Sequence, residues 1–220
     1  MFAARGMFMA TPPPEPKIPI TYDATGVGYM GNYNTVRTFS HTATAGAYVV
    51  LAFANDRSSF IPSNVQYAGT PMAQIGYAYS SNNSMYGVLA LYGLANVPGG
   101  ARTVSITGVV GGGWAIANTF SYINVASVSA PLANYGAGTL ISSGLVTCNT
   151  SEMIVCAAGY GSINLGQTLS NPTGGTNRYI TTATYGGSAL SVSDSQSSTT
   201  FTATPSGSAP WSTMSLILKP

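Results

Sequence analysis

Hydrophobic positions along the chain fall into short runs that are separated by Gly, Pro, Asn and Ser. Residues 48–54 are apolar at every position, which is typical of a buried strand. Residues 103–107 alternate polar and apolar side chains with the period of two of a strand that has one exposed face. Since no stretch repeats its apolar residues every three to four positions, we expect no helix longer than about two turns.

Glycine-rich turns connect these runs and indicate hairpins. Residues 68–71 separate the strand signals at 65–67 and 72–77, and glycine suits the tight turn between them. The same reasoning places turns at 149–152 and 186–188. Further strands are expected at residues 85–94, 114–125, 139–147, 153–158, 178–185, 189–193, 199–204 and 211–218.

Short strands with Gly-rich turns predict an all-β fold, an antiparallel β-sandwich of the jelly-roll-like kind with about eight to ten strands. We expect one sandwich domain over residues 21–220. Residues 111–125 and 208–220 share a pattern in which a Trp precedes a long strand, so a tandem of two smaller domains divided near Pro131 is the alternative. The expected core comprises Val49, Leu51, Phe53, Val88, Leu89, Leu91, Ile106, Ile116, Phe120, Ile154, Leu216 and Leu218.

Residues 1–20 differ from the rest and predict an extended N-terminal arm. Phe2, Met7, Phe8 and Met9 are apolar, and five prolines follow them before residue 20. Such a run cannot form a helix or a central strand. We expect the four apolar side chains to dock on a neighbouring subunit, with docking on the arm's own domain as the alternative.

Charge is scarce throughout the chain. Charged residues make up 5% of the sequence and the formal net charge is +2, whereas a typical soluble domain has about 25% charged residues. The seven basic residues are scattered, so no basic patch for nucleic acid is expected. A neutral surface of Ser, Thr, Asn, Gly and Tyr is typical of a protein that is packed within a larger assembly, because surface charge normally keeps free proteins in solution.

Membrane insertion and secretion are not expected from this sequence. The longest apolar stretch, residues 48–54, is far shorter than the roughly 18 residues that a membrane-spanning helix needs. The opening residues lack the apolar core and the cleavage site of a signal peptide.

The sequence offers no catalytic, cofactor-binding or metal-binding set. His41 is the single histidine, and it lies in an alternating polar segment at 38–44. Residues 26–31 match the G-x-G-x-x-G pattern, but no helix signal follows, so we interpret them as a glycine-rich loop. The five acidic residues form no metal or glycosidase motif. We therefore expect no cofactor and no enzymatic activity.

The two cysteines, Cys148 and Cys156, flank the turn at 149–152. If that turn closes a hairpin, the two sulfur atoms lie about three residues out of register, too far apart for a disulfide. We expect both thiols to be free and partly buried, as in a reducing compartment.

Tyrosine is abundant, with fourteen residues in the chain. Tyr, Asn, Ser and Gly in loops form adaptable contact surfaces. Tyr77, Tyr79 and Tyr86 surround a Ser/Asn segment, and Tyr160 lies within Gly-Tyr-Gly-Ser. These four are the candidate surface-contact aromatics, able to stack on sugar rings, although a tyrosine is more often found in a core or a subunit interface.

Several segments resemble a known module. The strings VQYAGTPMAQIG, LYGL, RTVSITG and the terminal WSTMSLILKP resemble a β-sandwich found in minor tail proteins and virion surface proteins of actinobacterial, mycobacteriophage-type tailed phages. The resemblance covers roughly residues 45–125 and the last ten. It implies a sandwich fold and a virion location, and it carries over no catalytic residue.

Three functions remain open at this point. The first is a minor tail protein that acts in assembly and in attachment to the host surface. The alternatives are a capsid decoration protein and a carbohydrate-binding module for host cell-wall glycan. The expected partners are copies of the chain itself, most simply as a trimer, together with other virion proteins and host glycan, and the expected location is the virion, in the tail rather than on the capsid.

Overall fold

The computed structural model describes residues 16–32, 36–56, 61–83, 86–108, 113–161, 168–181 and 187–220. Within these residues the fold is all-β, as the sequence predicts, and it has one 3-10 turn and no α-helix. The expected number of about eight to ten strands is wrong, because the described residues form nineteen strands. Residues 16–20 lead into the first strand without regular structure. The apolar arm residues Phe2, Met7, Phe8 and Met9 lie outside the described residues.

Sheet A has the strand order β1-β10-β4-β8-β7, and β2 pairs with β10 beside β1. The first half of the G-x-G-x-x-G pattern, residues 26–28, connects β1 to β2, and the second half, residues 29–31, belongs to β2 itself, so the pattern joins two strands rather than a strand and a helix. The strands of sheet A are β1 (Thr21–Thr25), β2 (Tyr29–Asn32), β4 (Tyr48–Asn55), β7 (Ala73–Tyr79), β8 (Val88–Leu94) and β10 (Trp114–Ile123).

Sheet B has the order β3-β9-β5-β6. The predicted hairpin at 68–71 is present, with Ala68 and Gly69 in the left-handed region at φ 51° and 80°. Its second strand is short, because the chain crosses to sheet A at Met72 and β7 pairs with β8. The strands of sheet B are β3 (Arg37–Ala43), β5 (Asn64–Tyr67), β6 (Thr70–Pro71) and β9 (Gly100–Thr107).

Sheets C and D contain the second half of the chain. Sheet C has the order β11-β19-β14-β17-β16, and β12 also pairs with β19, while sheet D has the order β13-β18-β15. Sheet C consists of β11 (Ser127–Val128), β12 (Leu132–Gly138), β14 (Met153–Gly161), β16 (Thr176–Ile180), β17 (Ser188–Ser195) and β19 (Ala209–Lys219), and sheet D of β13 (Ile141–Val146), β15 (Leu169–Thr173) and β18 (Thr199–Pro205).

The prediction that residues 149–152 close a hairpin is wrong. The turn itself exists, because the Glu152 N–H donates to the Asn149 carbonyl at 3.2 Å. However, β13 pairs with β18 and β14 pairs with β17 and β19, so the turn carries the chain from sheet D to sheet C. Cys148 and Cys156 are both free thiols, as predicted.

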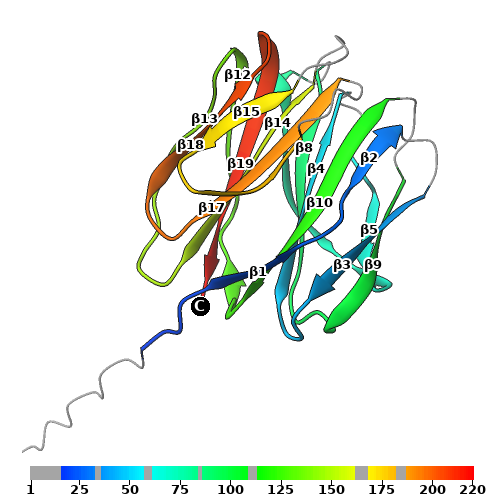
Figure 1. The fold of residues 1–220 in the computed structure, drawn as a ribbon, viewed down its shortest axis with the longest axis vertical. Coiled ribbons are helices and arrows are strands. Elements are labelled where there is room, and N and C mark those ends of the chain that lie inside the picture. Colours follow the sequence, from blue (N-terminus) through cyan, green and yellow to red (C-terminus); the bar gives the residue numbers. More distant parts are fainter. Residues whose placement is uncertain are drawn as a thin grey trace, which may run out of the picture.

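The four sheets stack in the order B, A, C, D, and sheets C and D form the left part of the molecule in Figure 1. Apolar side chains fill the three spaces between successive layers. Sheet A therefore packs on both faces, with Val49 and Leu51 toward sheet B and Val50 and Ala52 toward sheet C.

This stacking explains the uninterrupted apolar runs. All twelve predicted core residues are buried, with at most 3% of any side chain exposed. The prediction that residues 48–54 form a buried strand is confirmed, because every residue of β4 is buried, and every residue of β14 is buried as well. Alternation survives in the outer sheets, where β3 and β18 have one neighbouring layer each. Division of residues 21–220 into one domain or two stays a prediction.

Candidate contact surface

A compact loop follows β7 at one side of the molecule. It contains the 3-10 turn η1 (Ser80–Asn82), in which Ser81 and Asn82 adopt left-handed φ values of 53° and 52°. The Ser80 N–H donates to the Gly87 carbonyl at 2.8 Å, which closes the base of the loop. Left-handed conformations cost free energy in residues with a side chain, so the surrounding contacts must hold Ser81 and Asn82 in place.

The loop is also fixed to sheet C. The Ser81 hydroxyl donates to the carbonyl oxygen of Gly136 in β12 at 2.7 Å. Strand β12 contacts both η1 and β7, so the outer edge of sheet A meets that of sheet C. We call this surface the β7–β12 seam and define it by Tyr77, Tyr79, Asn82, Tyr86 and Tyr135.

Three of the four predicted contact tyrosines lie at the seam. Tyr77 and Tyr86 are exposed, at 48% and 39%. Tyr79 is half-buried against the core between sheets A and B. Its ring lies edge-on to Tyr77, with a centroid distance of 5.4 Å, and the two hydroxyls share a hydrogen bond. Burial raises the pKa of Tyr79, and Tyr77 raises it further. Tyr79 therefore positions the exposed ring of Tyr77.

The prediction that Tyr160 lies in an exposed loop is wrong. Tyr160 belongs to β14 and is 1% exposed, in the core between sheets C and D with Ile141 and Trp211. Burial raises the pKa of its hydroxyl. The flanking glycines reflect close packing rather than a turn: a Cβ at Gly161 would lie 2.5 Å from the Cα of Gly87.

Sequence reasoning missed the contribution of β12 to the seam. Tyr135 of β12 is 47% exposed. Tyr135 shares a face of sheet C with Ala133, whose paired residue Met214 lies in the core between sheets A and C. Tyr135 thus projects toward the layer of sheet A, at its outer edge. The sequence around Tyr135, LANYGAG, does not indicate that this side chain is exposed, because its exposure depends on the position of β12 in the stack of sheets.

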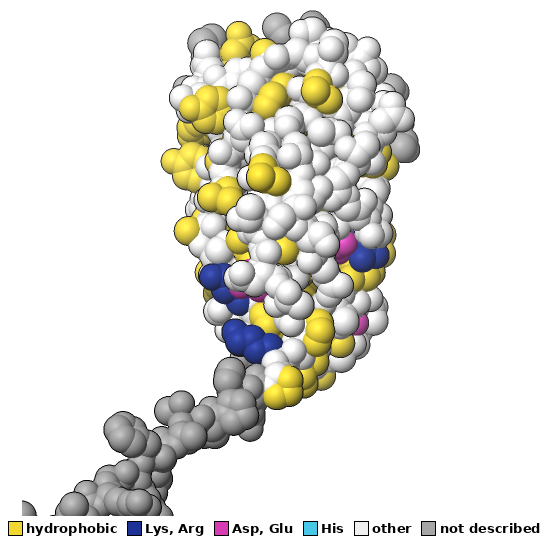
Figure 2. Space-filling model, turned by 90° about the vertical axis from the view of Figure 1, so that its left-hand side faces the viewer, with side chains coloured by type: hydrophobic (Ala, Val, Ile, Leu, Met, Phe, Trp, Pro, Cys, Tyr) yellow, Lys and Arg dark blue, Asp and Glu magenta, His cyan; other side chains and the backbone are white. Residues whose placement is uncertain are grey.

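The outer faces of sheets B and D carry hydroxyl groups in place of charges. In β18, the outward positions Thr200, Thr202 and Thr204 alternate with buried neighbours. Thr202 pairs with Ser142 and Thr173, and its hydroxyl lies 2.7 Å from that of Thr173. The face toward the viewer in Figure 2, on the side of sheet D, shows no charged side chain in its upper half.

The outer face of sheet B follows the same rule. Thr38, Ser40 and Thr42 of β3 are exposed and alternate with buried residues. The first two pair with Ser105 and Thr103 of β9. Both outer faces therefore present rows of neutral hydrogen-bonding groups.

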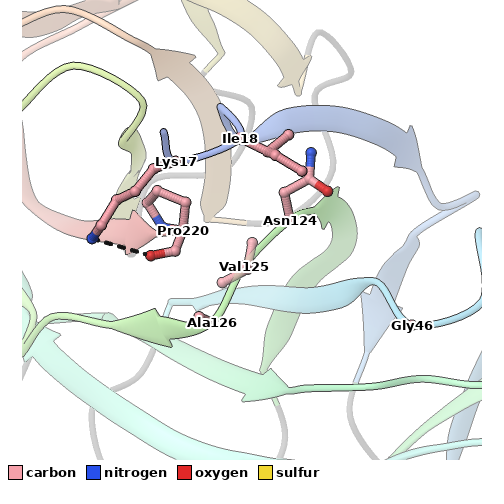
Figure 3. Close-up of a pocket in the computed structure, with 7 residues that line it drawn as sticks. All are labelled: Lys17, Ile18, Gly46, Asn124, Val125, Ala126 and Pro220. Carbon is pink, nitrogen blue, oxygen red and sulfur yellow. Dashed lines mark hydrogen bonds between the residues drawn. The ribbon is translucent and has the colours of Figure 1, made fainter. Parts of the chain in front are cut away.

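Two hollows flank the segment through which the chain enters sheet A. The first has a volume of about 480 Å³ and is lined by Lys17, Ile18, Val125 and Pro220 among others (Figure 3). There, Lys17 Nζ donates to the Pro220 carbonyl oxygen at 3.4 Å. The second hollow has a volume of about 520 Å³. Residues that line it include Pro19, Cys148, Asn149, Ser151 and Gln196.

His41 is buried rather than at a polar edge, with 1% of it exposed. Its Nδ1 lies 3.0 Å from the Thr119 hydroxyl, and burial lowers its pKa to about 4 although Asp23 acts weakly in the other direction. The carboxylate of Asp23 accepts hydrogen bonds from Thr44 and Ser121. These hydrogen bonds do not build the nucleophile–imidazole–carboxylate order of a catalytic triad.

Within the described ranges, no group of three or more His, Cys, Asp and Glu side chains is placed to hold a metal ion. In the same part of the chain, no helix has the length and apolar character needed to cross a bilayer.

Comparison with known proteins gave no match to a family model, to a curated protein or to a solved structure.

Proposed function

We propose that this protein is a structural component of a phage virion, a minor tail protein that works by packing against copies of itself and against other virion proteins. The absence of charge from the outer faces of sheets B and D carries the proposal. The segments that resemble minor tail proteins support it, since they include β5, β7, β8 and β9. The protein acts through contacts and has no catalytic turnover.

The physical argument concerns the cost of burial. Outward positions such as Thr38, Ser40, Thr200 and Thr202 hold hydroxyl groups, where a free soluble domain usually has Lys or Glu. Burying a charged group against a neighbour is costly, whereas a hydroxyl that exchanges water for a protein partner loses little. A surface of this kind suits permanent packing in an assembly.

Immunogold labelling of purified particles, with an antibody against this chain, tests the location. Gold along the tail is the expected result. Gold over the head would indicate a capsid decoration protein instead of a tail protein. Particles that carry no gold label at all would refute the virion proposal. Sedimentation of the isolated protein tests self-association, with a trimer as the expected closed form.

A further inference from the structure

We propose that the hollow beside Val125 and Ala126 is the docking site for residues 2–9 of a second copy of this chain. Each copy then donates one segment and receives one, so that the contacts run from copy to copy around a ring. This inference rests on the proposed self-association and adds the surface through which it acts.

The composition of residues 2–9 is the first part of the argument. The segment has a single charged residue, Arg5. Its four large apolar side chains are those of Phe2, Met7, Phe8 and Met9. Large apolar side chains gain free energy when a partner removes them from water. The segment therefore matches an apolar surface.

The first hollow offers such a surface. Its volume is about 480 Å³, and its apolar lining residues are Ile18, Val125, Ala126 and Pro220. In Figure 3, Lys17 and Pro220 lie at one end of the hollow and Gly46 at the other. Ile18 is 67% exposed although it belongs to the wall. An open isoleucine beside an apolar hollow indicates a surface that a partner covers.

The second hollow has a different chemistry, which decides between the two. In the first hollow, Lys17 and Asn124 are the only lining residues with polar side chains, whereas six lining residues of the second have hydroxyl or amide side chains. An apolar segment would take water from those groups without replacing its hydrogen bonds, which costs free energy. The first hollow is therefore the better match to residues 2–9.

The walls of the first hollow are fixed by hydrogen bonds. The Asn124 side chain donates to the Pro19 carbonyl oxygen at 2.9 Å, and the Ala126 N–H donates to the Lys219 carbonyl oxygen at 2.8 Å. Ile20 follows in the entry segment and is fully buried in the core between sheets A and C. A preformed hollow loses little conformational entropy when it receives a segment.

The prolines decide which copy supplies the segment. Between residues 2–9 and the hollow lie Pro12, Pro13, Pro14 and Pro16. Since proline favours the extended polyproline conformation, we expect the eight steps from Met9 to Lys17 to span about 25 Å. Lys17 is itself part of the wall. An extended spacer thus carries the apolar side chains away from their own hollow and toward that of a second copy.

Photocrosslinking of the full-length chain tests this docking. The photoreactive residue p-benzoylphenylalanine replaces Phe8, and isotope-labelled and unlabelled chains are mixed before irradiation. Mass spectrometry should find position 8 joined to residues 17–18 or 124–126, in peptide pairs that combine a labelled and an unlabelled chain. Crosslinks confined to single chains, crosslinks to another surface, or no crosslink at all would each overturn the proposal.

Substitutions on both sides of the contact are compared by sedimentation. Phe8→Ser removes an apolar side chain from the segment, and Ala126→Trp fills the hollow from its exposed wall. Each should weaken self-association about tenfold. Ala137→Trp is the matched control, because Ala137 is exposed and pairs with Pro210, at the opposite end of β19 from Pro220. It should associate like the wild type, and thermal unfolding should show that all variants remain folded. Equal weakening in the control would contradict the proposal.

The docking and the virion location can fail separately. Crosslinks through the hollow in a protein that labelling does not find on particles would support the contact and refute the location. Labelled particles together with crosslinks that avoid the hollow would do the reverse.

Discussion

Tyr122 in sheet A donates its hydroxyl hydrogen to Oδ2 of Asp194 in sheet C, at 3.2 Å, within the core between the two sheets. Arg178 Nε donates to the same oxygen at 2.8 Å, and its guanidinium lies 3.8 Å from the centroid of the Tyr22 ring. Burial raises the pKa of Tyr122 well above its ordinary value, and the neighbouring carboxylate adds to this effect. One buried carboxylate therefore links β1 and β10 with β16 and β17.

Asp194→Asn should lower the free energy of unfolding by about 3 kcal/mol, because it leaves the half-buried charge of Arg178 without its anion. Tyr122→Phe removes one hydrogen bond and should cost about 1 kcal/mol. Urea denaturation measures both. Thr42→Ala, at an exposed position of β3, is the control and should change little. An Asp194→Asn protein as stable as the wild type would show that the link between the sheets is dispensable.

Stability should fall in mild acid because of His41. Its pKa is about 4 in the folded protein, below the ordinary histidine value of 6.5. The neutral imidazole is thus favoured by folding, and the stabilisation present above pH 6.5 is lost as the pH falls toward 4. The total loss should reach about 3 kcal/mol, since each unit of pKa shift corresponds to about 1.4 kcal/mol.

Chemical denaturation at pH 7.5 and pH 4.5 measures this effect. The difference between the two should shrink in His41→Asn, whose amide can still bond the Thr119 hydroxyl but does not titrate. Carboxylates such as Asp23, with a pKa lowered by hydrogen bonds from Thr44 and Ser121 that outweigh its desolvation, contribute mainly below this range. An equal pH dependence in the variant and the wild type would contradict the assignment to His41.

Backbone contact between sheets A and C should make Gly87 intolerant of substitution. A Cβ at Gly87 would overlap the carbonyl oxygen of Asn55 in sheet A and would lie 2.8 Å from the Cα of Gly161 in sheet C, so the backbone would have to shift both within sheet A and between the two sheets. Gly46→Ala is the comparison: a Cβ there meets nothing within 4 Å, but φ is +83°. We expect Gly46→Ala to cost about 1 kcal/mol from backbone strain alone. Gly87→Ala should cost clearly more in the same denaturation experiment.

The two thiols should differ in reactivity. Cys156 is 3% exposed, and burial raises its pKa to about 12. Cys148 is partly exposed, and burial followed by the charge of Glu152 raises its pKa more modestly. Since the thiolate is the nucleophile, iodoacetamide should modify Cys148 slowly and Cys156 only after unfolding. Peptide mass spectrometry separates the two sites, and labelling of Cys156 in the folded protein would refute its burial.

The fold class and the core were predictable because the apolar residues within a short segment indicate whether that strand is buried. Val49 and Leu51 follow directly from the apolar run, as do Leu216 and Leu218. The stacking order was not predictable. An apolar run such as that of β4 indicates that both faces of the strand are buried, but it does not indicate which sheets cover them. The turn at Asn149 illustrates the same limit: a turn signal does not say whether the chain returns beside its strand or crosses to another sheet.

The candidate site was predictable only in part. Tyr77 and Tyr86 were found because Ser and Asn residues between them mark an exposed loop. Tyr160 was misplaced because glycine residues occur both in turns and where two backbones approach closely. Gly159 and Gly161 permit close approach between sheets, since a Cβ at Gly159 would lie 3.3 Å from Ala54 Cβ. Tyr135 was missed because its exposure follows from tertiary position alone.

Hydroxyl groups in place of charges make the outer faces of sheets B and D nearly indifferent to ionic strength. Mobile ions screen attractions between charges beyond about 8 Å at physiological salt, but they do not weaken contacts between neutral groups. A partner held on these threonine-rich faces should remain bound in seawater-like salt as well as in dilute buffer. Excluded salts such as sulfate would tighten the contact, because they strengthen burial rather than screen it.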